Sequence, residues 1–207
     1  MSALCTGILS GFLSFFLTKY FGGIKSIPLA KDSIFFLPGL IFGILILVSF
    51  LANRMVDNER YPILKSFVWV ALSTFAYYAV VETVIMSSEI DNTLSANIVF
   101  FLAGMVGAAI VFIGLKISLF RLSLRYLIPL VVIGGGLGFT FHFGTTSDEQ
   151  LLYLYVLWQS GMALAISVAA WHQNMLKAPK DPPSSARQQL GHVRRAWLKG
   201  SRRQSSW

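Results

Sequence analysis

The 207-residue chain has little of what soluble proteins use to fold and to carry out chemistry. It has one cysteine and three histidines, and 13% of its residues are charged, against about 25% in an ordinary soluble domain. The single cysteine, Cys5, excludes an intrachain disulfide and any paired-cysteine metal site. With 55% hydrophobic residues and a mean hydropathy of +0.66, the composition is that of a membrane protein.

Catalytic signatures are also missing. The sequence contains no Walker A lysine loop, no H-E-x-x-H pair and no G-x-S-x-G elbow. Of the three histidines, only His142 lies toward the outer side of the membrane in the arrangement derived below, so a multi-histidine zinc site is not expected. We therefore predict no catalytic residue, no metal and no cofactor.

Six apolar blocks occupy most of the chain, and each is about as long as a helix that crosses a hydrocarbon core of about 30 Å. Helices satisfy their own backbone hydrogen bonds in lipid, and the blocks lack the strict alternation of a membrane barrel. We predict an all-α fold, with six transmembrane helices in one bundle over 1–175 and a basic cytoplasmic C-terminal tail over 176–207. The blocks are Ala3–Tyr20, Ile34–Ala52, Pro62–Met86, Asn97–Phe120, Tyr126–Gly144 and Leu151–Gln173.

Nearly all charges lie between the blocks, and the two sides of the predicted membrane differ in sign. Of the 17 Lys and Arg residues, only Lys19, Lys25 and Lys31 fall on one side, whose other loops are acidic. Short loops rich in Lys and Arg stay in the cytoplasm. The pattern therefore predicts cytoplasmic N- and C-termini, in the plasma membrane or, in a bacterium, the inner membrane.

The tail begins with a Pro-rich hinge and then repeats apolar residues at helical spacing. Basic residues occupy the remaining face, which is typical of a membrane-surface helix that binds anionic lipid headgroups. A solvated tail without fixed structure is the alternative, and nucleic acid is not expected as a partner. The predicted membrane-surface residues are Arg187, Arg194, Arg195, Trp197 and Lys199.

Small residues four positions apart mark places where membrane helices can approach closely. Four such pairs predict a tightly packed bundle. The pattern fits contacts within one chain and contacts with a second copy or a partner membrane subunit equally well. The pairs are Gly7 with Gly11, Gly39 with Gly43, Gly104 with Ala108, and Gly134 with Gly138.

A few polar residues interrupt the apolar blocks, and a charge at the bilayer centre costs at least about 3 kcal/mol. Glu82 lies in the outer half of the third block with Tyr78 one turn away, and His142 lies at similar depth in the fifth. Gln159 adds an amide from the sixth block. We predict that these four residues line a polar pocket in the outer half of the membrane. The alternative places the two ionisable residues among lipid headgroups without a specific role.

These features favour a transporter or channel component that handles a small polar solute or cation through the outer-half pocket. The alternative is a non-catalytic assembly or adaptor protein that acts through oligomerisation and its basic tail. A membrane-embedded enzyme that acts on lipid is the third and least favoured function. Loss of function on replacing Glu82 would favour the first, and loss on truncation after Lys177 would favour the second.

Overall fold

The part of the chain that the structure describes is helical apart from short turns and contains no strand, which confirms the predicted all-α class. The computed structural model describes residues 3–22, 33–53, 62–87, 93–119, 122–141 and 148–177. The chain divides into two compact units, Met1–Gln173 and Asn174–Trp207, and the helix bundle belongs to the first. The helices are α1 (Ala3–Gly22), α3 (Ser33–Ala52), α4 (Pro62–Ser87), α5 (Thr93–Ser118), the 3-10 turn η1 (Leu124–Tyr126), α6 (Leu127–Gly138) and α8 (Asp148–Lys177).

Each of the six predicted apolar blocks coincides with one of these helices. Within the described residues, α1, α4, α5 and α8 are long and apolar enough to cross a membrane, whereas α3 and α6 are shorter apolar helices. Four helices therefore have the length and composition of membrane spans. Crossing by α3 and α6 stays a prediction, as does the basic tail, whose predicted surface residues lie outside the described residues.

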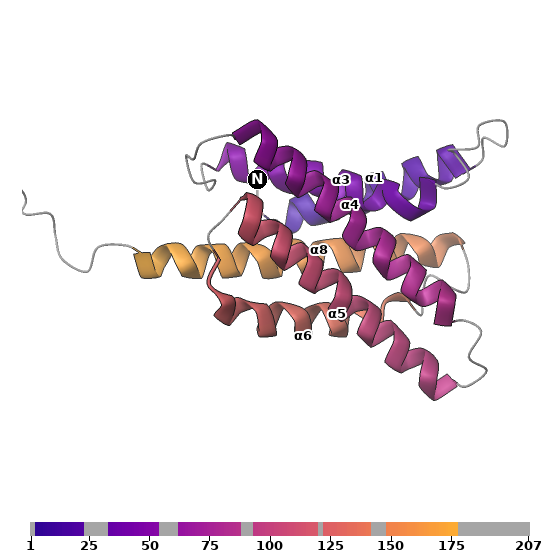
Figure 1. Cartoon of the computed structure of the whole chain (residues 1–207). Coiled ribbons are helices and arrows are strands. Elements are labelled where there is room, and N and C mark those ends of the chain that lie inside the picture. The colour runs from indigo at the N-terminus through magenta and orange to yellow at the C-terminus, as the bar shows by residue number, and fades with distance from the viewer. Residues whose placement is uncertain are drawn as a thin grey trace, which may run out of the picture. The chain divides into compact units, whose positions relative to one another are not determined.

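Neighbouring helices pack antiparallel, as short loops between spans require. Gly39 and Gly43 of α3 meet Ser73 and Trp69 of α4 in reverse order. In Figure 1, α8 lies between α1 and α6, whereas α5 crosses α8 in this view and packs against α4. Contacts agree with this view, because α8 touches α1 through Ser160 and α6 through Gly161.

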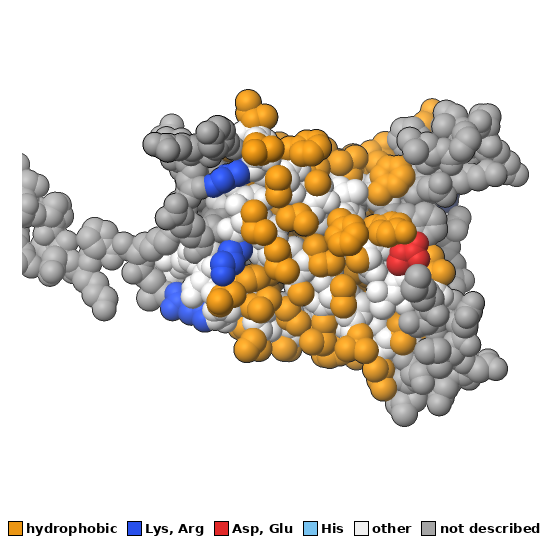
Figure 2. Space-filling model, in the orientation of Figure 1, with side chains coloured by type: hydrophobic (Ala, Val, Ile, Leu, Met, Phe, Trp, Pro, Cys, Tyr) orange, Lys and Arg blue, Asp and Glu red, His pale blue; other side chains and the backbone are white. Residues whose placement is uncertain are grey.

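The core lies around the middle of α8. Trp158 packs against Phe42 of α3 with ring centroids 6.0 Å apart, and Met162 is fully buried one turn further on. Many large apolar side chains point outward instead, as expected of helices surrounded by lipid tails. Figure 2 shows hydrophobic side chains across the face in view, with Lys and Arg gathered at one end and an acidic side chain toward the other.

The α3–α4 contact shows how polar groups are satisfied inside the bundle. Trp69 is fully buried, and its Nε1 donates to the Gly43 carbonyl at 2.8 Å. Ser73 Oγ donates to the Gly39 carbonyl, also at 2.8 Å. Pro38 lies inside α3 directly before this contact. A proline there removes a backbone donor and loosens the local ladder of hydrogen bonds.

α6 is the shortest of the main helices, and its sequence explains why. Pro129 stands in its first turn, where a missing backbone N–H costs nothing because that group has no partner within the helix. Three consecutive glycines, Gly134 to Gly136, then weaken the helix by about 1 kcal/mol each relative to alanine. The helix ends at Gly138 after 12 residues, or about 18 Å.

All four predicted small-residue pairs lie at close contacts within the chain. A Cβ added to Gly104 or Gly134 would clash with the partner helix across the α5–α6 contact, and one added to Gly39 would lie 2.7 Å from the Ser73 carbonyl oxygen. The prediction of a tightly packed bundle is therefore confirmed. Other helices of the same chain contact these faces, and an oligomer or partner subunit that uses them stays a prediction. Oligomerisation itself stays a prediction.

Candidate functional site

α1 carries a row of buried hydroxyl groups at four-residue intervals. Thr6, Ser10, Ser14 and Thr18 are at most 4% exposed, and this spacing places all four on one face of the helix. The row extends over about 18 Å at 1.5 Å per residue. Since lipid-facing side chains of α1 are half exposed, as at Phe16, the row faces the interior of the bundle.

Two glycines beside this row let α1 approach α8 backbone to backbone. A Cβ added to Gly7 would clash with the backbone of Ser160, and one added to Gly11 would lie 2.5 Å from Val156 Cα. In each case the glycine directly follows a hydroxyl residue of the row. The close approach therefore brings the hydroxyl row against the inner face of α8.

Gln159 of α8 forms the centre of this contact. Its side chain is fully buried, and its Nε2 donates to Ser14 Oγ at 2.9 Å and to the Pro38 carbonyl of α3 at 3.4 Å. Ser14 Oγ in turn donates to Gln159 Oε1 at 3.3 Å. One amide thus joins three helices, using both of its N–H donors and its oxygen.

Other buried polar groups of α1 and α8 have no hydrogen-bond partner among the described residues. These are Ser10 Oγ and Thr18 Oγ1 of α1, and Tyr155 OH and Trp158 Nε1 of α8. The Tyr155 ring packs against Tyr77 of α4, with ring centroids 6.1 Å apart. A buried polar group left without a partner costs about 1–3 kcal/mol. We call the set Thr6, Ser10, Ser14, Thr18, Tyr155 and Gln159 the polar seam.

Of the four predicted pocket residues, Gln159 lies in the polar seam, whereas Tyr78 lies on another face. Tyr78 is 42% exposed and lines a shallow apolar groove with Phe36 and Leu40 of α3. Glu82, one turn further along α4, is partly buried, and its carboxylate interacts with Tyr78. His142 lies outside the described residues. A pocket formed by all four residues therefore stays a prediction.

The orientation of α4 explains why Tyr78 points outward. Its buried face carries Trp69, Ser73, Ala76, Tyr77 and Val80. Consecutive helix positions are about 100° apart, so burial of Tyr77 turns its neighbour outward. A tyrosine tolerates such a place, because its ring suits lipid and its hydroxyl reaches a polar partner.

The hydroxyl row of α1 was not predicted as a site, although its four-residue spacing is visible in the sequence. Ser and Thr often bond to their own helix, so their spacing alone marks no site. No group of three or more His, Cys, Asp or Glu side chains that could hold a metal occurs among the described residues.

Comparison with known proteins found no matching protein family, no matching curated protein and no matching solved structure. The fold and the site define the class only as an all-α protein with the helices of a membrane protein. Function must therefore be inferred from the polar seam itself.

Proposed function

We propose that this protein is a small transporter or channel component that binds a small uncharged polar solute along the polar seam. One observation carries the proposal: a row of buried hydroxyls on α1 packs beside α8, where Ser14 bonds to the fully buried Gln159. Ser10 and Thr18 of the row have no hydrogen-bond partner among the described residues. A solute rich in hydroxyl or amide groups, or a chain of water molecules, would supply the missing hydrogen bonds.

The chemistry of the seam favours an uncharged solute over a cation. Its residues are hydroxyls and one amide, with no carboxylate. Removing a charge from water without a counter-charge is expensive in the membrane interior. Amide and hydroxyl groups offer both donors and acceptors, which match a neutral polar molecule.

A second form of the proposal places the solute site elsewhere. It uses the predicted outer-half pocket, which consists of Glu82, Tyr78, His142 and Gln159. It would suit a cation or a proton, because a carboxylate and an imidazole both offer lone pairs that can bind either one. The interaction of Glu82 with Tyr78 supports part of it. The two forms make opposite predictions for replacement of Glu82.

Six crossings with both termini in the cytoplasm complete the proposal. α3 has 20 residues, which corresponds to about 30 Å and to the thickness of a hydrocarbon core. Reporters fused after Arg60, Arg121 and the C-terminus should read cytoplasmic. Fusions after Lys25 and Asp91 should read external, and a cytoplasmic signal at Asp91 would refute six crossings.

Flux through liposomes that contain the purified protein tests the proposal. Urea and glycerol entry, followed by light scattering, should exceed entry into empty liposomes. Q159L should reduce that excess at least about tenfold, since it removes the amide at the centre of the seam. E82Q should leave it unchanged, and circular dichroism should show that both variants keep their helices.

Loss of flux in E82Q but not in Q159L would favour the outer-half pocket. Absence of any flux above empty liposomes, for both solutes and for water, would contradict transport. The remaining function would then be that of a non-catalytic assembly or adaptor protein, in which the polar seam only forms hydrogen bonds between helices. Loss of function on truncation after Lys177 would then be the expected result.

A further inference from the structure

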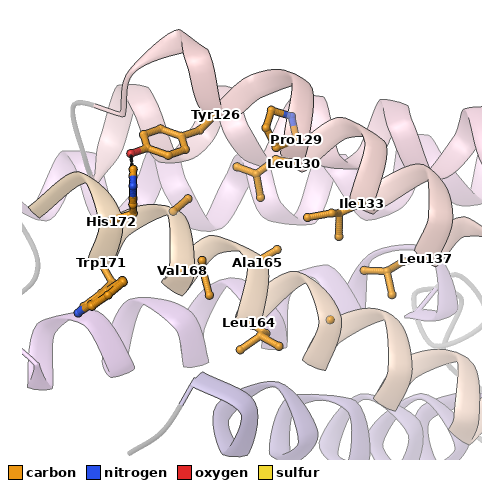
Figure 3. A pocket seen from close by; sticks show the side chains of 12 residues that line it. Tyr126, Pro129, Leu130, Ile133, Leu137, Leu164, Ala165, Val168, Trp171 and His172 are labelled. Carbon is orange, nitrogen blue, oxygen red and sulfur yellow. Dashed lines mark hydrogen bonds between the residues drawn. The ribbon is translucent and has the colours of Figure 1, made fainter. Parts of the chain in front are cut away.

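A groove, separate from the polar seam, lies between α6 and α8. It has a volume of about 570 Å³, within the range of about 300–1,000 Å³ typical of ligand sites. Its lining is almost entirely apolar, as Figure 3 shows for Ile133 and Leu137 on α6 and for Leu164 and Val168 on α8. Leu164 and Val168 are about half exposed, so the groove opens outward from the bundle.

The groove owes its depth to small residues. Gly161, Ala165 and Ala169 recur every four residues along α8 and line it. Tyr126 lines one end and Leu137 the other, 11 positions apart, which corresponds to about 16 Å along α6. One leaflet makes up half of a hydrocarbon core of about 30 Å, so its thickness is nearly the same as the length of the groove. The groove is therefore as long as one leaflet of the bilayer.

A polar cluster closes the end of the groove where α6 begins and α8 ends. Tyr126 OH lies 2.7 Å from His172 Nδ1 and accepts a hydrogen bond of 2.9 Å from Arg125 Nη2. The Arg125 guanidinium also lies 4.8 Å from the centre of the Tyr126 ring. Figure 3 shows the link between Tyr126 and His172 beside the apolar lining.

This cluster offers hydrogen-bond donors. If Tyr126 donates to His172 Nδ1, the imidazole carries its proton on Nε2, which is then a donor to the surroundings. The exposed guanidinium of Arg125 keeps further N–H groups beyond the one bonded to Tyr126. A positive charge with several N–H donors suits a phosphate, especially through paired bonds to arginine.

We propose that this groove binds a membrane phospholipid with an anionic headgroup, one acyl chain lying between α6 and α8 and the phosphate bound by Arg125 and His172. The apolar length matches one leaflet, and the charge at its end complements the headgroup. The site is independent of the polar seam, so its failure would leave the transport proposal intact.

Native mass spectrometry of the full chain in detergent tests this proposal. With phosphatidylglycerol and phosphatidylcholine of identical acyl chains, the protein should retain one phosphatidylglycerol at least about tenfold more strongly. R125Q should remove that preference, and R125K should keep part of it. K116Q, which removes an exposed lysine outside the groove, should leave it unchanged.

A matched pair of tryptophan variants tests the acyl-chain position. Val168 lines the groove and is 55% exposed, whereas Val132 is 54% exposed and lies outside it. V168W should abolish lipid retention by filling the groove, and V132W should not. Equal retention of the two lipids, equal behaviour of the two tryptophan variants, or an unchanged preference in R125Q would overturn the proposal.

Discussion

The α5–α6 and α1–α8 contacts carry the same small-residue spacing but have different chemistry. At α5–α6, Gly104 meets Gly134 and Gly138, and the neighbouring side chains are alanine and phenylalanine. At α1–α8, Gly7 and Gly11 make an equally close approach, but each directly follows a hydroxyl residue. Glycine spacing therefore determines how closely two helices approach. The residues beside the glycines determine whether the contact is apolar or polar.

The largest expected effect concerns the apolar contact. G138A places a Cβ against the Phe100 carbonyl oxygen, so α5 and α6 must separate. Overpacking of this kind costs up to about 3 kcal/mol, and we expect the Tm to fall by roughly 5–10 °C. Thermal unfolding in detergent, followed by tryptophan fluorescence, measures the change.

G136A is the matched control in the same helix. A Cβ at Gly136 meets no atom of the described residues within 4 Å, so only the helix-propensity gain of about 1 kcal/mol is expected. Its Tm should stay constant or rise by a few degrees. If G136A were as destabilising as G138A, close approach would not be the reason for glycine in this contact.

An intermediate effect is expected from the hydrogen bonds of the polar contact. A double-mutant cycle with S14A and Q159L should give a coupling free energy of about 0.6–1.7 kcal/mol in thermal unfolding, the range found for interhelical hydrogen bonds in membranes. Ser66 bonds within its own helix, so S66A combined with Q159L should be additive. Additivity for Ser14 and Gln159 would show that their contact contributes no stability.

The smallest effect is expected outside both contacts. E82Q removes the charge that interacts with Tyr78 on the partly exposed side of α4. Exposed interactions of this kind contribute little to stability, so the Tm should move by no more than a few degrees. A larger loss would mean that Glu82 has a structural role inside the bundle.

Much of the fold was predictable from sequence, because apolar length and small-residue spacing report directly on membrane helices and their contacts. All six apolar blocks coincide with helices, and the pair Gly104 and Ala108 packs on α6 as its spacing implied. The length of α6 was overestimated, since hydrophobicity does not register the weak helix propensity of Gly134 to Gly136.

The candidate site was predicted only in part. Gln159 was identified because an amide stands out in an apolar helix, and it is fully buried. The face that Tyr78 occupies depends on the rotation of α4, which is set by its contact with Gly39. The partners of Gln159, Ser14 and the Pro38 carbonyl, come from helices 145 and 121 positions away in sequence. No local pattern could connect them.

Access of water to the polar seam tests the central claim most directly. Ser10 and Ser73 are matched positions, 0% and 2% exposed, but Ser10 lies in the seam whereas Ser73 bonds to Gly39 between α3 and α4. In a background where Cys5 is replaced by serine, S10C should react with a small water-soluble thiol reagent in membranes and S73C should not. Equal protection of both positions would contradict a water-accessible seam and leave it as packing alone.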